Sequence, residues 1–166
     1  MQTAEQIPNQ PQFGVLTPVQ TRIEDYDMFG HVNNVRCVSY LEIARSHVFF
    51  DVLGLSRAET NALTANININ YLKPIKYGLP VGVSLSVKRM GKKSMNLSFQ
   101  IVDHDHPETV FAEGEIAQVL IDMKTTQTCA IPETLREKVD QLNAGNPHRA
   151  GVDRQYVIEP NWKVLS

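Results

Sequence analysis

The residues best suited to chemistry lie together in DYDMFGHVNN, residues 25 to 34, just before a long apolar segment. A carboxylate can serve as a general base or nucleophile. The start of a helix offers unpaired backbone N–H groups and a partial positive charge. Such N–H groups stabilise an oxyanion that forms at a carbonyl under attack. The stretch therefore allows a turn that aims a carboxylate and the end of a helix at one point, although so short a fragment is more often only a helix cap.

The other polar residues of this stretch are expected to shape the turn. Gly30 permits a tight turn and a close approach of the backbone to a substrate. His31, Asn33 and Asn34 can fix the turn through hydrogen bonds from side chain to backbone. On the residues alone, Asn33 or Asn34 could instead simply cap the helix, since asparagine is a common cap. Asp25 is expected at the end of a strand, facing water and without a catalytic role.

The elements around this turn follow from the periodicity of the sequence. Five segments alternate apolar and polar residues with a period of two, which predicts half-buried strands at 16–23, 64–72, 81–88, 95–101 and 111–123. Short polar turns join the last three strands, which favours an antiparallel meander. A helix over 34–53 is apolar around most of its circumference, so it must be covered on most sides. These features predict an α+β fold in which a curved antiparallel sheet wraps around a long central helix.

Length and composition fit one domain. The chain has 166 residues and a formal net charge of -2, without the dense basic face that a nucleic acid would need. The two cysteines form no CxxC pair, which favours reduced thiols and a cytoplasmic location. No apolar run is long enough for a membrane anchor. We expect a flexible lead-in at 1–13, one domain over 14–144 with an amphipathic second helix at 132–142, and a C-terminal extension at 145–166 on the surface or on a partner.

The stretch DYDMFGHVNNVRCVSYLEIAR resembles the D-x-x-G-H-V-N-N…Y-L-E-x-A-R signature of hotdog-fold acyl-CoA thioesterases of the 4-hydroxybenzoyl-CoA thioesterase type. The likeness continues in INYLKPIKYG, MGKKS and GEIAQVLIDMKTTQTCAIP. It implies hydrolysis of an acyl-CoA thioester to free acid and CoA, without a bound cofactor or metal, since CoA belongs to the substrate. It also implies a homodimer joined edge to edge, or a homotetramer, with active sites at the dimer interface.

The resemblance assigns roles to particular residues. It implies that Asp27 is the general base or nucleophile and that the backbone N–H near Asn34 polarises the thioester carbonyl. Gly30, His31, Val32 and Asn33 complete the substrate-binding turn. The loop between the third and fourth strands, which holds the CoA phosphates in the family, falls on Lys92, Lys93 and Ser94. Two departures, Cys37 in place of an aromatic ring and GLP at 78–80 in place of G-D, concern substrate choice and loop geometry.

Several alternatives stay open. Glu42 and Arg45 have the spacing of a structural ion pair on a helix, and Glu42 is the next catalytic candidate after Asp27. Lys92 and Lys93 could be a solvated hairpin tip. Residues 104–108, HDHPE, are expected to form a surface loop, because ligands so close together on one turn cannot easily converge on an ion.

The main functional alternative is a module that binds acyl thioesters without hydrolysing them. A hydratase or dehydratase on the same fold is a third possibility. Those enzymes usually carry a catalytic histidine with an acid partner, an arrangement that His31 does not match well.

Overall fold

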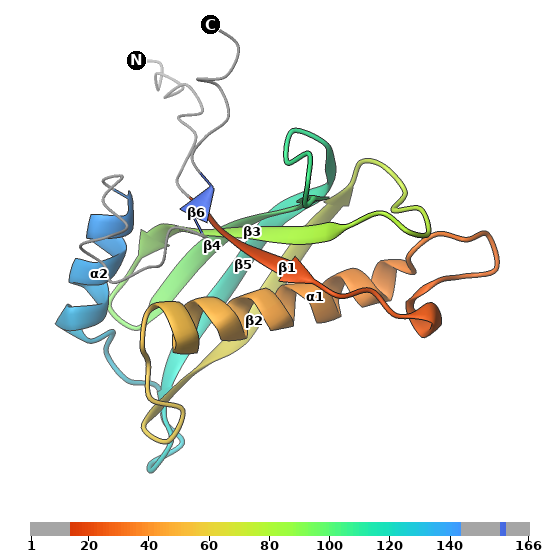
Figure 1. The fold of residues 1–166 in the computed structure, drawn as a ribbon. Coiled ribbons are helices and arrows are strands. Elements are labelled where there is room, and N and C mark those ends of the chain that lie inside the picture. The colour runs from red at the N-terminus through yellow and green to blue at the C-terminus, as the bar shows by residue number, and fades with distance from the viewer. Residues whose placement is uncertain (1–13, 144–156, 159–166) are drawn as a thin grey trace, which may run out of the picture.

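The computed structural model describes residues 14–143 and 157–158, and it contains one sheet with two α-helices (Figure 1). The strands are β1 (Gly14–Val19), β2 (Thr60–Tyr71), β3 (Val81–Met90), β4 (Ser94–Asp103), β5 (Val110–Asp122) and β6 (Val157–Ile158). The helices are η1 (Ile23–Asp25), α1 (Asn34–Ser46), η2 (His47–Val52) and α2 (Glu133–Asn143). The predicted α+β hotdog fold is confirmed.

The sheet has the strand order β2-β5-β4-β3-β1-β6, and every neighbouring pair is antiparallel. The predicted meander of β3, β4 and β5 is therefore present, joined by short hairpins. Alternate residues of β4 such as Leu97, Phe99 and Ile101 are buried, while their neighbours Asn96 and Gln100 are exposed. The period-two pattern thus reports a sheet with one covered face.

The long helix covers that face, as Figure 1 shows for α1 lying across the sheet. Leu41, Ala44 and Phe49 are fully buried in the core, together with inward residues of β3, β4 and β5. The predicted helix over 34–53 is continuous but changes its hydrogen bonding after Ser46. There η2 makes one wider turn, in which the N–H of Leu53 donates to the carbonyl of Val48 at 2.8 Å.

Most boundaries of the strands differ from the sequence prediction by one or two residues, and the sheet differs more at three places. The first strand ends at Val19 rather than residue 23, because the chain then enters η1. The second strand begins at Thr60 and is longer than predicted, with a bulge between Thr64 and Asn66. Part of the expected C-terminal extension, β6, pairs with Gly14 and Val15 of β1. The lead-in at 1–13 and the rest of that extension lie outside the described residues.

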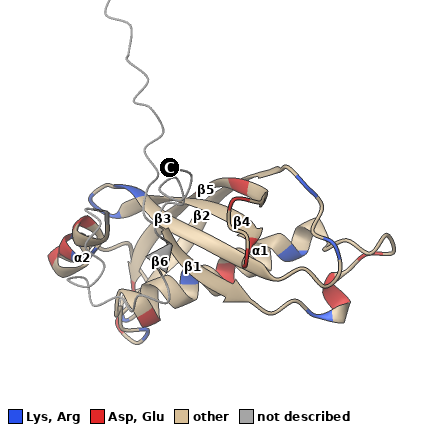
Figure 2. Ribbon diagram, turned by 45° about the horizontal axis from the view of Figure 1, so that its top comes forward, with Lys and Arg blue, Asp and Glu red and all other residues tan. Residues whose placement is uncertain are grey.

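The surface carries mixed charge. In Figure 2, lysine and arginine lie on several elements and are interspersed with aspartate and glutamate, without one sign gathering on one face of this view. None of the helices in the described part of the chain is long and apolar enough to cross a bilayer.

Candidate active site

The turn at residues 27–31 is closed by backbone hydrogen bonds. The N–H of Asp27 donates to the carbonyl of His31 at 2.8 Å, and the N–H of Gly30 donates to the carbonyl of Asp27 at 3.1 Å. Gly30 has φ of +74°, in the left-handed region that other residues adopt at a steric cost. The expected requirement for glycine in this turn is therefore met.

The carboxylate of Asp27 is held by one of its two oxygens. Its Oδ1 accepts hydrogen bonds from the N–H of Phe29 at 2.8 Å and the N–H of His31 at 3.1 Å. Among the described residues no donor contacts Oδ2 of Asp27. The turn thus fixes the direction of the carboxylate and leaves one oxygen available to a water molecule or a substrate. His31 contributes to the turn through its backbone, whereas a side-chain bond was expected.

The start of α1 lies next in the chain. Asn33 is the N-cap, and its side-chain oxygen accepts from the N–H of Val35 at 2.9 Å. The carbonyl of Asn33 accepts from the N–H of Arg36 at 2.8 Å. Within the described part of the chain, no acceptor contacts the N–H of Asn34, the first residue of the helix. This N–H also lies at the positive end of the helix dipole.

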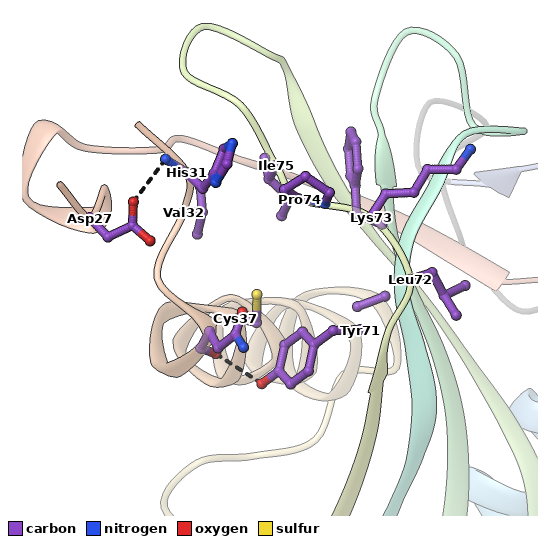
Figure 3. Close-up of a pocket in the computed structure, with 12 residues that line it drawn as sticks. Asp27, His31, Val32, Cys37, Tyr71, Leu72, Lys73, Pro74 and Ile75 are labelled. Atoms are coloured by element: carbon purple, nitrogen blue, oxygen red, sulfur yellow. Dashed lines mark hydrogen bonds between the residues drawn. The ribbon is translucent and has the colours of Figure 1, made fainter. Parts of the chain in front are cut away.

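A cavity of about 300 Å³ brings these groups together (Figure 3). Its lining comes from the 27–34 turn, the first turns of α1, the segment after β2, and the start of β5. The lining residues are Asp27, His31, Val32, Asn34, Cys37, Tyr71, Leu72, Lys73, Pro74, Ile75, Phe111 and Ala112. The expected site residues Asp27, His31, Val32 and Asn34 thus surround one space, which Gly30 and Asn33 adjoin without lining it.

The segment from Tyr71 to Ile75 was missed as part of the site. It is tied to the turn by a backbone bond from Val32 N–H to the Ile75 carbonyl at 2.9 Å, and just beyond it the N–H of Tyr77 donates to the Gly30 carbonyl at 3.1 Å. The hydroxyl of Tyr71 donates to the carbonyl of Asn34 at 3.1 Å. The one signal for this segment in the sequence was the likeness of INYLKPIKYG to the thioesterase family, and this likeness does not show which residues the segment contacts.

The walls of the cavity mix apolar and polar side chains, and burial affects two of its ionisable groups. Burial raises the pKa of the Cys37 thiol to about 11, so the thiol is protonated near neutral pH and is a poor nucleophile. Burial also raises the pKa of Tyr71, which stays a neutral hydrogen-bond donor. Among the described residues that line the cavity, Asp27 is the one carboxylate, and it lies beside a thiol and a phenol that hold their protons.

The residues expected to hold phosphates lie elsewhere in the single chain. Lys92 and Lys93 form the tip between β3 and β4, and Ser94 pairs with Val119. The ammonium of Lys93 donates to Thr128, at 3.1 Å to its hydroxyl and 3.3 Å to its carbonyl. The cavity lies at the other end of β4, where Ile101 pairs with Ala112, about 23 Å away along the strand. One chain does not bring these two groups together.

The structural prediction for Glu42 and Arg45 is confirmed. Their side chains form an ion pair at 2.6 Å, and Arg45 also donates to the carbonyl of Ala62 at 3.0 Å. Neither residue lines the cavity.

Residues 104–108 form part of the turn between β4 and β5, where Asp103 accepts from the N–H groups of Asp105 and His106. Across the residues that the structure describes, no three or more potential ligands are placed to hold a metal ion.

The prediction that Asp25 faces water at the end of a strand was wrong. The residue is only 5% exposed, because the chain leaves β1 and turns through η1, which places the carboxylate against α1. There it accepts from the hydroxyl of Tyr40 at 2.8 Å and lies 3.4 Å from the guanidinium of Arg36.

Comparisons with known proteins show which family the chain resembles. The sequence model of the thioesterase-like superfamily matches residues 21–139. The long-chain acyl-CoA thioesterase FadM of Escherichia coli is 32% identical over 135 residues, covering 76% of this chain and 97% of FadM.

Among solved structures, a thioesterase from Thermus thermophilus complexed with coenzyme A and zinc is 26% identical. It aligns over 81% of this chain and 98% of its own, with a TM-score of 0.68. The probable thioesterase YbaW of Escherichia coli is 31% identical, with a TM-score of 0.62 over 78% of this chain and 98% of its own.

Proposed function

Because the chain belongs to the thioesterase-like superfamily and is a thioester hydrolase, we propose that it hydrolyses acyl-CoA at the cavity beside Asp27. The observation that carries the proposal is the meeting of a fixed carboxylate and the first residue of a helix at one cavity. Thioester hydrolysis needs these two parts, one to supply the nucleophile and one to stabilise the oxyanion.

In this proposal Asp27 activates a water molecule or attacks the thioester carbon itself. Two backbone N–H groups already occupy Oδ1, so the reacting atom is Oδ2. The N–H of Asn34 donates to the carbonyl oxygen as negative charge develops on it. The helix dipole adds to that stabilisation, and the N-cap Asn33 holds the first turn in place.

The acyl group is proposed to lie against the apolar walls of the cavity, namely Val32, Cys37, Ile75 and Phe111. A volume of about 300 Å³ takes roughly ten groups the size of a water molecule or a methylene. Together with the similarity to the long-chain acyl-CoA thioesterase FadM, this supports a substrate with a medium or long acyl chain.

We propose that the active unit is a homodimer, and that a homotetramer would consist of two such dimers. The outer edge of β2 is unpaired over its length in the described chain, and an unpaired edge is a ready template for another strand. Next to it lie exposed apolar side chains of α1 and β2, including Val35 at 73% and Leu63 at 53%. Contact between two such faces would cover them and would place each cavity close to a second chain.

The dimer also bears on Lys92, Lys93 and Ser94. Since one chain holds them far from its own cavity, their proposed role toward the CoA phosphates requires the partner's hairpin to reach across the interface. Their exposure at a hairpin tip supports this role. The two free cysteines are in keeping with a proposed cytoplasmic location.

The test measures release of the free CoA thiol from a series of acyl-CoAs, with the wild type beside Asp27→Asn. Asparagine can still accept the hydrogen bonds from Phe29 and His31, so the substitution removes the charge and keeps the turn. Loss of a general base lowers kcat by about 100- to 10,000-fold. Asp51→Asn, which changes an exposed carboxylate outside the cavity, is the matched control.

A wild type that binds acyl-CoA but releases no thiol from any chain length would contradict hydrolysis and favour the binding module. Unchanged turnover by Asp27→Asn would leave the thioesterase standing and remove Asp27 from the mechanism. Glu42 would then be the next residue to test.

A further inference from the structure

We propose that Asp25 and Tyr40 form a buried positioning pair that holds Asp27 and the Asn34 N–H in register with each other. The inference rests on the proposed function, because it concerns how that site is kept in shape. Neither residue lines the cavity, so both are positioning residues rather than catalytic ones.

Asp25 bonds to the chain on both sides of the catalytic turn. On the incoming side, its Oδ2 accepts from the backbone N–H of Arg22 at 2.9 Å. On the outgoing side, its backbone carbonyl accepts from the N–H of Asn33 at 2.8 Å. The same residue therefore fixes the segment that leads into Asp27 and the N-cap that precedes Asn34.

The helix is tied to this point by two side chains. The hydroxyl of Tyr40, which is buried on α1, donates to Oδ2 of Asp25 at 2.8 Å. The guanidinium of Arg36 lies 3.4 Å from Oδ1. These contacts fix the position of α1 relative to η1 and thus set the separation between the helix end and the turn.

The charge states of the pair are consistent with this role. Burial by itself would raise the pKa of Asp25, but the Arg22 N–H, the Tyr40 hydroxyl and Arg36 together bring it below its ordinary value. Burial and the adjacent carboxylate raise the pKa of Tyr40. Asp25 therefore stays an acceptor and Tyr40 a donor across the range in which the enzyme would work, and a charge-assisted bond of this kind is among the stronger ones.

A displacement of about 1 Å between reacting groups can cost about 100-fold in rate. We therefore expect Asp25→Asn and Tyr40→Phe to lower kcat by about 10- to 100-fold, with little change in KM. The double variant is expected to be no slower than the slower single variant, because both changes weaken the same bond: Asp25→Asn removes the charge of its acceptor and Tyr40→Phe removes its donor.

Asp103→Asn is the matched control. Asp103 is also buried and also accepts from two backbone N–H groups in a turn, but it lies outside the cavity. It is expected to keep the wild-type kcat. Circular dichroism and thermal unfolding establish that each variant is folded at the temperature of the assay.

Amide hydrogen exchange supplies a readout besides activity. In Asp25→Asn, the amides of Phe29, His31 and Asn33 should exchange about tenfold faster or more, while core amides of β4 and β5 keep their protection. Loss of protection spread evenly over the protein would overturn the inference in favour of a general effect on stability.

Wild-type turnover in folded Asp25→Asn would equally overturn it and would leave the proposed thioesterase intact. An inactive wild type would instead contradict the proposed function. In that case the exchange of these three amides still decides whether Asp25 holds the turn.

Discussion

The backbone N–H of Asn34 can be removed by a single substitution, because it belongs to the first residue of a helix. Proline lacks the N–H and is favoured at this position, where its fixed φ suits the helix. The residue before it, Asn33, already has φ of −63° and ψ of 135°, an extended conformation that proline requires of its predecessor. Asn34→Pro should therefore delete the proposed oxyanion donor and leave α1 in place.

The size of the effect follows from the role proposed for this group. Removal of one oxyanion donor lowers kcat by about 100- to 1,000-fold. The folded state loses no hydrogen bond, since no described residue accepts from this N–H, and the bond from Tyr71 to the Asn34 carbonyl is kept. The melting temperature should thus stay close to that of the wild type.

The assay compares kcat for CoA release in Asn34→Pro and Asn34→Ala. Alanine removes the amide side chain and keeps the N–H, so the ratio of the two isolates the donor. If the proline variant is folded and turns over within about a factor of three of the alanine variant, the reasoning is refuted. The oxyanion would then have to be stabilised by another group.

Three further predictions follow from the geometry. Gly30→Ala and Gly78→Ala should each destabilise the protein by about 1–2 kcal/mol in denaturant unfolding, because both glycines have a positive φ. Only Gly30→Ala should also lower kcat for CoA release. Alkylation of Cys37 should be slow at neutral pH and accelerate up to about pH 11, while the more accessible Cys129 serves as the internal comparison in mass spectrometry. Ile43 is a second exposed apolar residue of α1, and Ile43→Asp should convert the proposed dimer to a monomer in light scattering and lower the activity as well.

The architecture could be predicted from the sequence because the spacing of apolar residues shows which faces of the helices and strands are buried. Alternation along 95–101 predicted a strand covered on one face, and the apolar circumference of 34–53 predicted a helix enclosed by a sheet. The turn at 27–33 could also be predicted, since Asp27, Gly30 and Asn33 form hydrogen bonds with backbone groups only a few residues away.

What the sequence did not reveal depends on contacts between distant residues. Asp25 looked like a solvated residue at a strand end, because its partner Tyr40 lies on the helix and meets it only after the chain turns through η1. The wall formed by Tyr71 to Ile75 was hidden for the same reason. A polar residue beside a motif does not disclose which element will cover it.

The two edges of the sheet differ, and this limits how far the protein can grow by adding strands. On one side β1 is short, contains Pro18 without an N–H, and is partly covered by β6, which together discourage a further strand. Only the β2 edge is long and open in the described chain. In a dimer formed through this edge, the β2 strands of both copies are paired and no long open edge is left. Strand addition then stops at the dimer and does not continue into a fibre.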